Sequence, residues 1–289
     1  MSRSTGASCK SEAPEQPCPG GPGSTLVAMF IQNIDIAFNR EVLSGTFLMG
    51  LIAPEIVAEA RPGQFVMIRV SAGSDPLLRR PFSICGTRKD RLLLILYKVV
   101  GQGTSILSRT MEGEQLSVLG PLGTGFELPD TGRAPILVAG GMGTAPLLFL
   151  AQAMGPEDLT FLAGYRSKEE VLDIDEIGFS GMNISIATDD GSFGHPGLVT
   201  ELLEAHLKTS EDRGFEIYTC GPMPMIRQVA SLALSSEISC QVSLETTMAC
   251  GLGACQGCVV KSASPEQTYI HVCKDGPVFH AGSLDWEYL

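Results

Sequence analysis

Apolar and polar positions follow one pattern before residue 130 and another after it. Before residue 130, short apolar runs are bounded by Gly, Pro, Asp and Ser, as in "RPGQFVMIRV", "DRLLLILYKVV" and "EGEQLSVLGPLG". Runs of this length predict β-strands. Because they recur without long helical patterns between them, we expect a β-barrel or a sandwich over residues 26–130.

After Asp130, buried strands alternate with helical patterns. The expected strands are "APILVAG", "DLTFLAGY", "NISIATDD", "FEIYTC" and "SCQVSLE", and the expected helices are "APLLFLAQAM", "GLVTELLEAHL" and "PMIRQVASLAL". This alternation predicts an α/β domain with a parallel sheet over residues 131–244. A small module rich in cysteine, residues 245–289, follows, and the Pro- and Gly-rich residues 1–25 are expected to form a disordered tail.

Charge and composition narrow the class of protein. The net charge of -12 argues against a nucleic-acid-binding surface. Residues 134–156 carry no charge and are long enough to span a membrane, but glycines and Pro146 interrupt them, so a strand, a turn and a helix explain them better. Nine cysteines without a secretory signal indicate a reducing compartment, and we expect a cytoplasmic protein.

Four cysteines near the C-terminus form the clearest motif. Cys250, Cys255 and Cys258 have the spacing C-x4-C-x2-C, and Cys273 follows. Zinc sites usually combine two C-x2-C pairs or a C-x2-C pair with histidines, whereas this spacing is that of a plant-type [2Fe–2S] cluster. The small residues between the cysteines allow a tight loop around a cluster. Zinc is the alternative occupant.

A second constellation suggests a flavin site. Arg80, Pro81, Phe82 and Ser83 could supply a pyrophosphate clamp, an aromatic cover and a hydrogen bond to the flavin. An Arg-Pro turn followed by a core Phe fits the same residues. In "VVGQGTSILS", glycines including Gly103 open a short helix at Thr104, which could bind phosphate or could be an ordinary capped helix.

Two further motifs follow predicted strands of the α/β domain. Gly140, Gly141 and Gly143, with Pro146 in the first helical turn, permit close approach of a diphosphate to a helix N-terminus. Cys220, Gly221 and Pro222 follow a later strand, where α/β sheets bind ligands, although Cys220 could be a buried structural thiol. Asp189 or Asp190 could hold a ribose, or the pair could simply form a turn.

In this order the motifs resemble the ferredoxin–NADP reductase superfamily, and the C-terminal "MACGLGACQGCVV" and "CKDGPVF" resemble the electron-transfer subunits of class 1B dihydroorotate dehydrogenases. The resemblance covers residues 27–289 and implies FAD, one [2Fe–2S] cluster and NAD. The FAD contacts that it implies are Arg80, Pro81, Phe82, Ser83, Leu96, Tyr97, Lys98, Gly103 and Thr104. The NAD contacts that it implies are Gly140, Gly141, Gly143, Thr144, Pro146, Cys220, Gly221 and Pro222, with Cys220 also a candidate catalytic residue.

The resemblance also implies a function. The expected partner is an FMN-containing dihydroorotate dehydrogenase catalytic subunit, in a heterotetramer of two plus two, which passes electrons through the cluster and FAD to NAD+ in pyrimidine biosynthesis. A small flavin subunit of an NAD(P)H-dependent ferredoxin reductase, or of a related bifurcating complex, is the alternative enzyme. A zinc-stabilised module without redox function is the alternative of another class.

Overall fold

The N-terminal part of the chain folds as a closed six-stranded barrel. The computed structural model describes residues 29–289 except 90, 131, 156–158 and 210–213, so the expected tail with Cys9 and Cys18 lies outside the described residues. The barrel order is β1-β2-β5-β4-β3-β6, with all described pairings antiparallel. Its strands are β1 (Phe30–Leu43), β2 (Thr46–Ile52), β3 (Phe65–Arg69), β4 (Arg80–Arg88), β5 (Leu92–Lys98) and β6 (Gln115–Leu122), and its helices are α1 (Pro54–Glu59) and α2 (Gln102–Leu107).

The continuous apolar run of β5 is explained by burial on both faces. Leu93, Ile95 and Tyr97 point into the barrel core. Leu94 and Leu96 point outward and pack with residues of α3 (Thr144–Met154) in a second core. Since alternate residues of a strand face opposite sides, a strand covered on both sides needs apolar residues at nearly every position.

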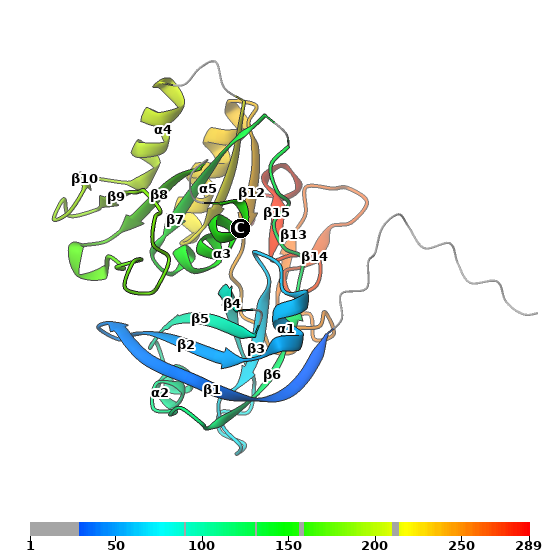
Figure 1. Ribbon diagram of the computed structural model, residues 1–289. Helices are drawn as coiled ribbons and strands as arrows, with labels where there is room; N and C mark the ends of the chain where they lie inside the picture. Colours follow the sequence, from blue (N-terminus) through cyan, green and yellow to red (C-terminus); the bar gives the residue numbers. More distant parts are fainter. Residues whose placement is uncertain (1–28, 90, 131, 156–158, 210–213) are drawn as a thin grey trace, which may run out of the picture.

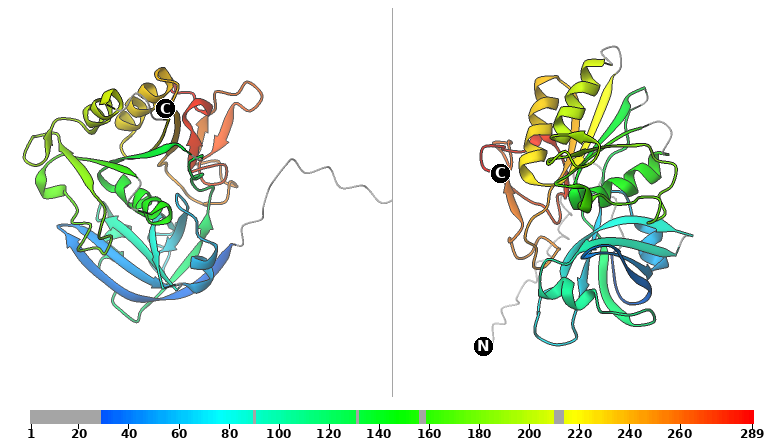
Figure 2. Two further views of the ribbon diagram at one scale, coloured as in Figure 1. Left: turned by 45° about the horizontal axis from the view of Figure 1, so that its top comes forward. Right: turned by 90° about the vertical axis from the view of Figure 1, so that its left-hand side faces the viewer.

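The α/β domain confirms the predicted parallel sheet. Its seven strands have the order β10-β9-β8-β7-β11-β12-β15, and α3 covers one face while α4 (Val199–Thr209) and α5 (Met223–Ser235) cover the other, as the two views in Figure 2 show. The strands are β7 (Ala134–Gly140), β8 (Thr160–Tyr165), β9 (Ile184–Thr188), β10 (His195–Pro196), β11 (Phe215–Cys220), β12 (Ser239–Ser243) and β15 (Val278–His280). None of the helices among the described residues has the length and apolarity that crossing a membrane requires.

The cysteine module packs against both preceding domains, across the predicted boundary at residue 245. Its strand β15 pairs antiparallel with β12 and completes the sheet of the preceding domain, while β13 (Val259–Lys261) and β14 (Tyr269–His271) form a hairpin of their own. In Figure 1 the module, drawn in orange and red, lies beside both the sheet and the barrel. A Cβ on Gly251 would lie 2.8 Å from Met67 Cγ of β3, so the cysteine loop rests directly on the barrel.

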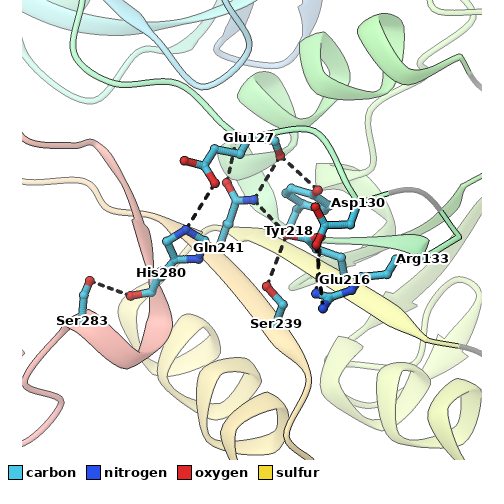
Figure 3. A network of polar contacts seen from close by, with 9 residues as sticks. All are labelled: Glu127, Asp130, Arg133, Glu216, Tyr218, Ser239, Gln241, His280 and Ser283. Atoms are coloured by element: carbon cyan, nitrogen blue, oxygen red, sulfur yellow. Dashed lines mark hydrogen bonds and ion pairs between the residues drawn. The ribbon is translucent and has the colours of Figure 1, made fainter. Parts of the chain in front are cut away.

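A polar network, buried at Glu216, Tyr218 and Gln241, joins the segment after the barrel to the sheet (Figure 3). The Gln241 side chain accepts a hydrogen bond from the Glu127 backbone N–H at 2.9 Å and donates to the Glu127 carbonyl at 3.0 Å and to the buried Glu216 carboxylate at 3.0 Å. The Tyr218 hydroxyl donates to the same Glu127 carbonyl. His280 of β15 contacts the Glu127 carboxylate at 3.4 Å. The network therefore fixes the linker between the two domains against β11, β12 and β15.

Candidate functional site

A cavity of about 450 Å³ lies between the barrel, α2 and the segment that leaves β12. This volume is in the range of small-molecule sites. All nine residues that the resemblance assigned to FAD border it: Arg80, Pro81, Phe82, Ser83, Leu96, Tyr97, Lys98, Gly103 and Thr104. We call it the flavin cavity.

Arg80 of the flavin motif and the preceding Arg79 have different environments. Arg79 donates to the Ser117 carbonyl at 2.6 Å and to the Ser117 hydroxyl at 2.9 Å, so it ties β4 to β6. Arg80 is the first residue of β4 and lies against α2, where a Cβ on Gly103 would come within 3.0 Å of its Nε. Gly103 thus leaves room for the Arg80 guanidinium beside the start of the helix, which suits binding of a pyrophosphate.

Helix α2 begins earlier than the sequence pattern predicted. It starts at Gln102 with Gly101 as its N-cap, whereas the pattern placed the opening at Thr104. Thr104 is the third helical residue, and its hydroxyl accepts hydrogen bonds from the backbone N–H groups of Val100 at 2.9 Å and Gly101 at 3.2 Å. The prediction was wrong by two residues because Thr104 closes a capping box from inside the helix.

Aromatic residues form the barrel side of the flavin cavity. Phe82 is 8% exposed and belongs to the barrel core, but it also borders the cavity, so the core and flavin interpretations both apply to it. Its ring meets Tyr97 edge-on at 5.7 Å between centroids. The Tyr97 hydroxyl donates to Asn39 Oδ1 at 3.0 Å, which holds its ring in place.

A second cavity, of about 480 Å³, lies at the carboxyl ends of the parallel strands. We call it the nucleotide cavity. Here the two glycine motifs meet. A Cβ on Gly143 would lie 2.1 Å from the Cys220 carbonyl oxygen. Gly221 has a φ of +155°, and a Cβ on it would lie 2.9 Å from the Gly140 Cα. Only glycine allows this close approach of two turns. Gly140, Gly141, Gly143, Gly221 and Pro222 border the cavity.

The remaining predicted nucleotide contacts lie behind that surface. The Thr144 hydroxyl lies 3.3 Å from the Tyr165 hydroxyl, and Pro146 is buried within the first turn of α3. Cys220 is 1% exposed and does not border either cavity. Burial, together with the charge of Glu245, raises the pKa of its thiol well above the ordinary value. Cys220 is therefore a neutral thiol at neutral pH, and its catalytic role stays a prediction.

The segment that leaves β12 crosses the boundary of the two cavities, and its role could not be read from the sequence. Ser243, Leu244, Glu245, Thr246 and Met248 all border the flavin cavity. Glu245 borders the nucleotide cavity as well. Glu245 is exposed, because both cavities reach it. The cavity walls still surround much of its carboxyl group, and this partial burial raises its pKa. Its position is where a flavin and a nicotinamide would meet.

Of the two interpretations of the aspartates after β9, the turn fits Asp190 and the ribose contact fits Asp189. Asp190 accepts hydrogen bonds from the Ser192 N–H at 2.9 Å and the Ser192 hydroxyl at 2.6 Å, so it forms the turn. Asp189 borders the nucleotide cavity. It is placed as an acidic residue that could bind a ribose.

The four cysteines of the module lie together on one loop and its neighbouring hairpin. Cys250 lies beside Cys255, and Cys258 lies beside Cys273, whose N–H donates to the Cys258 sulfur at 3.5 Å. Backbone N–H groups of Leu252 and Gly253 donate to Cys250 Sγ at 3.3 Å and Cys273 Sγ at 3.1 Å. In the described part of the chain, no three such ligands gather around a single-ion position. Two pairs of thiols suit a cluster with two iron atoms better than one zinc ion.

The thiols differ in how readily they ionise. Partial burial opposes ionisation of Cys250, but backbone N–H donors, Leu252 first, lower its pKa to about 6. Burial and the adjacent Cys258 raise the pKa of Cys273 to about 12. Cluster binding would therefore displace protons, as it does wherever thiols become metal ligands. Cys255 is exposed at the loop surface, while Cys258 and Cys273 are buried.

Comparisons with known proteins decide the family. Residues 245–285 match the family model described as the iron–sulfur cluster binding domain of dihydroorotate dehydrogenase B, and residues 137–231 match the oxidoreductase NAD-binding domain. The dihydroorotate dehydrogenase B (NAD(+)) electron transfer subunit of Desulforamulus reducens is 39% identical over 250 residues, which cover 85% of this chain and 95% of that one. This chain belongs to that family. The subunit from Bacillus caldolyticus is 37% identical over 88% of this chain and 98% of its own length.

Solved structures agree on the architecture. The NADH-dependent reduced ferredoxin-NADP oxidoreductase, described for flavin-based electron bifurcation, is 30% identical, with a TM-score of 0.76 and coverage of 88% of this chain and 90% of that chain. Phthalate dioxygenase reductase, at 17% identity and a TM-score of 0.57, covers 84% of this chain and 94% of that chain and shows the fold alone. The predicted fold class and superfamily are confirmed, and the cluster module is of the iron–sulfur type rather than zinc-stabilised.

Proposed function

We propose that this chain is the electron-transfer subunit of a dihydroorotate dehydrogenase that uses NAD+, in pyrimidine biosynthesis. The single observation that carries the proposal is the order of three adjoining sites: the four cysteines, the flavin cavity and the nucleotide cavity. Family membership supports each of the three cofactors, namely a [2Fe–2S] cluster, FAD and NAD. When bound, these groups supply one-electron and two-electron transfer.

The chain's own residues would bind and orient these groups. The cluster ligands would be Cys250, Cys255, Cys258 and Cys273. Arg80 and Gly103 would hold the FAD pyrophosphate, and Ser83 and Tyr97 would border its ring system. The glycine turns at Gly140 and Gly221 would receive the dinucleotide, and the β12 exit segment would exclude water where the two cofactors meet. The cysteine loop rests on β3, the neighbour of β4, so its cysteines would hold a cluster beside the barrel wall, near the flavin cavity.

The name of the relatives supports a second subunit as partner. We propose that this partner is an FMN-containing catalytic subunit that oxidises dihydroorotate, in a heterotetramer of two plus two. The FAD and NAD assignments account for both cavities, which supports a partner subunit as the place where dihydroorotate is oxidised. Seven free thiols among the described residues support a reducing, cytoplasmic location.

Cys255→Ser tests the electron route. The variant should lose the cluster and nearly all orotate formation coupled to NAD+ in the complex with the partner, because the route depends on four thiolate ligands. Reduction of FAD by NADH should persist, since the flavin and nucleotide cavities are intact. Iron and sulfide content, the visible spectrum and coupled turnover are the measurements. Cys240→Ala, which removes a buried thiol outside the cluster loop, is the control. Unchanged coupled turnover in Cys255→Ser would overturn the route.

The 30% identical ferredoxin-NADP oxidoreductase favours a second candidate function, electron exchange with ferredoxin. The relatives named for dihydroorotate dehydrogenase reach higher identity over equal coverage, which favours the first. The two candidates separate in one assay. NADH-linked reduction of ferredoxin without a dihydroorotate-oxidising partner would support the second candidate, whereas orotate formation coupled to NAD+ in the complex would support the first.

A further inference from the structure

A buried hydroxyl without a partner borders the nucleotide cavity. Thr200 is the second residue of α4, is 1% exposed, and its Oγ1 has no hydrogen-bond partner among the described residues. Buried hydroxyl groups are normally hydrogen-bonded, and an unsatisfied one destabilises the fold. Because Thr200 lines the cavity, a ligand bound there could supply the missing partner.

Close packing brings the N-terminus of α4 to the cavity. A Cβ on Gly164, near the end of β8, would lie 2.9 Å from Val199 Cβ, so the absence of a side chain lets the first turn of α4 rest on this strand. Helix α4 has 11 residues. In its first turn the N–H of Glu201 donates to the Leu198 carbonyl at 3.0 Å, so the N–H groups of Val199 and Thr200, together with the helix dipole, would favour an anion. The acidic residue of this turn, Glu201, contacts His195 at 2.8 Å and does not border the cavity.

The charged side chains of the nucleotide cavity cannot by themselves account for binding of a diphosphate. The cations among its described lining residues are Lys98 and Arg166, and both contact Glu170. Asp189 and Glu245 add two further carboxylates to the lining. Since the cations are already paired and the remaining charges are negative, a dianionic diphosphate must depend on neutral donors, which are N–H groups at helix N-termini and hydroxyl groups.

The sheet order indicates which part of a dinucleotide would reach Thr200. The nicotinamide end must lie where the two cavities meet, at Met142 and Glu245, which border both. The glycine turn after β7 comes next. Thr200 borders the cavity where the first turn of α4 packs on β8, and Asp189 follows the last residue of β9. In the sheet, β8 and β9 lie on the opposite side of β7 from β12, whose exit segment borders the flavin cavity, so both residues are on the side away from the flavin. That side would receive the adenosine half.

We propose that the Thr200 hydroxyl and the first turn of α4 bind the adenosine-side phosphate of NAD(H), while the glycine turn before α3 binds the other phosphate. The proposal rests on NAD(H) as the nucleotide of the proposed function. It adds a second helix N-terminus to the diphosphate site and gives the orphaned hydroxyl its partner.

Three variants of the subunit in its complex test the proposal. Thr200→Val keeps the shape of the side chain but removes the hydroxyl, and it should raise the KM for NADH in FAD reduction about tenfold, the loss expected for a hydrogen bond to a charged group. Thr200→Ser keeps the hydroxyl and should remain near wild type. Thr209→Val, at the exposed other end of α4, is the matched control and should also remain near wild type. FAD and iron content should be equal in all three.

Two further measurements separate a binding role from a structural one. Without nucleotide, Thr200→Val should be at least as thermally stable as wild type, because it removes an unsatisfied buried hydroxyl, whereas the rise in Tm caused by NADH should shrink. AMP, which carries only the adenosine-side phosphate, should inhibit wild type competitively with NADH and inhibit Thr200→Val about tenfold more weakly.

The outcomes distinguish this proposal from the proposed function. If wild type reduces its FAD with NADH and Thr200→Val has an unchanged KM, the phosphate contact is wrong and the proposed function stands. If the KM rises but AMP inhibition is unchanged, the assignment to the adenosine side is wrong. If wild-type complex does not react with NADH at all, the proposed function fails and this contact fails with it.

Discussion

At the scale of single residues, Glu245 combines two properties that suit it to act on a hydride donor. It borders both cavities, and burial raises the pKa of its carboxyl group above the ordinary value of 4.5. A carboxylate there would favour the positive charge that develops on a nicotinamide as it gives up hydride. The ionised form of Glu245 should therefore be the active one.

The expected consequence is a pH-dependent rate. Reduction of FAD by NADH should rise as the pH increases through the raised pKa of Glu245, at a pH above 4.5. Glu245→Gln should lack this rise of the rate with pH, and its FAD should be reduced roughly tenfold more slowly. The loss should be smaller than for a fully enclosed group, because solvent reaches this carboxylate. Stopped-flow traces at saturating NADH measure the rate, with Glu287→Gln, an exposed position near the C-terminus, as the control. An identical pH profile in Glu245→Gln would remove this residue from the reaction.

At the scale of secondary-structure elements, Gln241 of β12 connects three parts of the fold. Its side chain accepts a hydrogen bond from the Glu127 N–H of the linker and donates one to the Glu127 carbonyl. It also donates to the buried Glu216 of β11 (Figure 3). Gln241→Leu would leave the Glu216 carboxylate and the Glu127 carbonyl with fewer hydrogen-bond donors, so the free energy of unfolding should fall by roughly 2–3 kcal/mol. Urea denaturation checks the value, and Gln267→Leu on the exposed β13–β14 connection should change it little. Equal loss in both variants would contradict the role of the network.

At the scale of the whole molecule, an ion pair links the wall of the barrel to the α/β domain. Lys98 of the barrel contacts Glu170 of the α/β domain at 3.1 Å, and Arg166 contacts the same carboxylate. The hydrogen bond from Arg166, with a smaller effect of Lys98, lowers the pKa of Glu170 to about 2. Because the folded pKa lies below the ordinary value, this stabilisation is present above about pH 4.5 and is lost as the pH falls toward 2.

Glu170→Gln should therefore lower stability by about 1 kcal/mol at pH 7, a value typical of partly exposed pairs. The difference in Tm between wild type and Glu170→Gln should be constant from pH 6 to 8 and should shrink below pH 4.5, where the wild-type carboxylate begins to lose its advantage. Glu176→Gln, a nearby exposed change without such partners, should show no such trend. A difference that grows on acidification would mean that the pair is not the cause.

The sequence allowed much of the site to be predicted, because its motifs are local. All nine residues predicted to contact FAD border one cavity, and the glycines at 140, 141, 143 and 221 border the next. The predicted start of α2 was wrong by two residues, since the Thr104 hydroxyl accepts hydrogen bonds from N–H groups that precede it in the chain, whereas an N-cap residue would accept them from the residues that follow. Thr144 and Cys220, which are also predicted to contact the nucleotide, lie behind the cavity surface, because motif membership does not distinguish a lining side chain from a supporting one.

Local patterns were enough to predict the order of barrel, parallel sheet and cysteine module, because apolar periodicity and cysteine spacing depend on neighbours a few residues away. The folded structure was needed to show that β15 completes the sheet beside β12, that the segment after Ser243 lines the flavin cavity, and that Thr200 borders the nucleotide cavity. These contacts join residues far apart in the chain, such as Glu245 with Arg80 across one cavity. No local pattern encodes them, since they form only when packing of separate elements buries their apolar faces together.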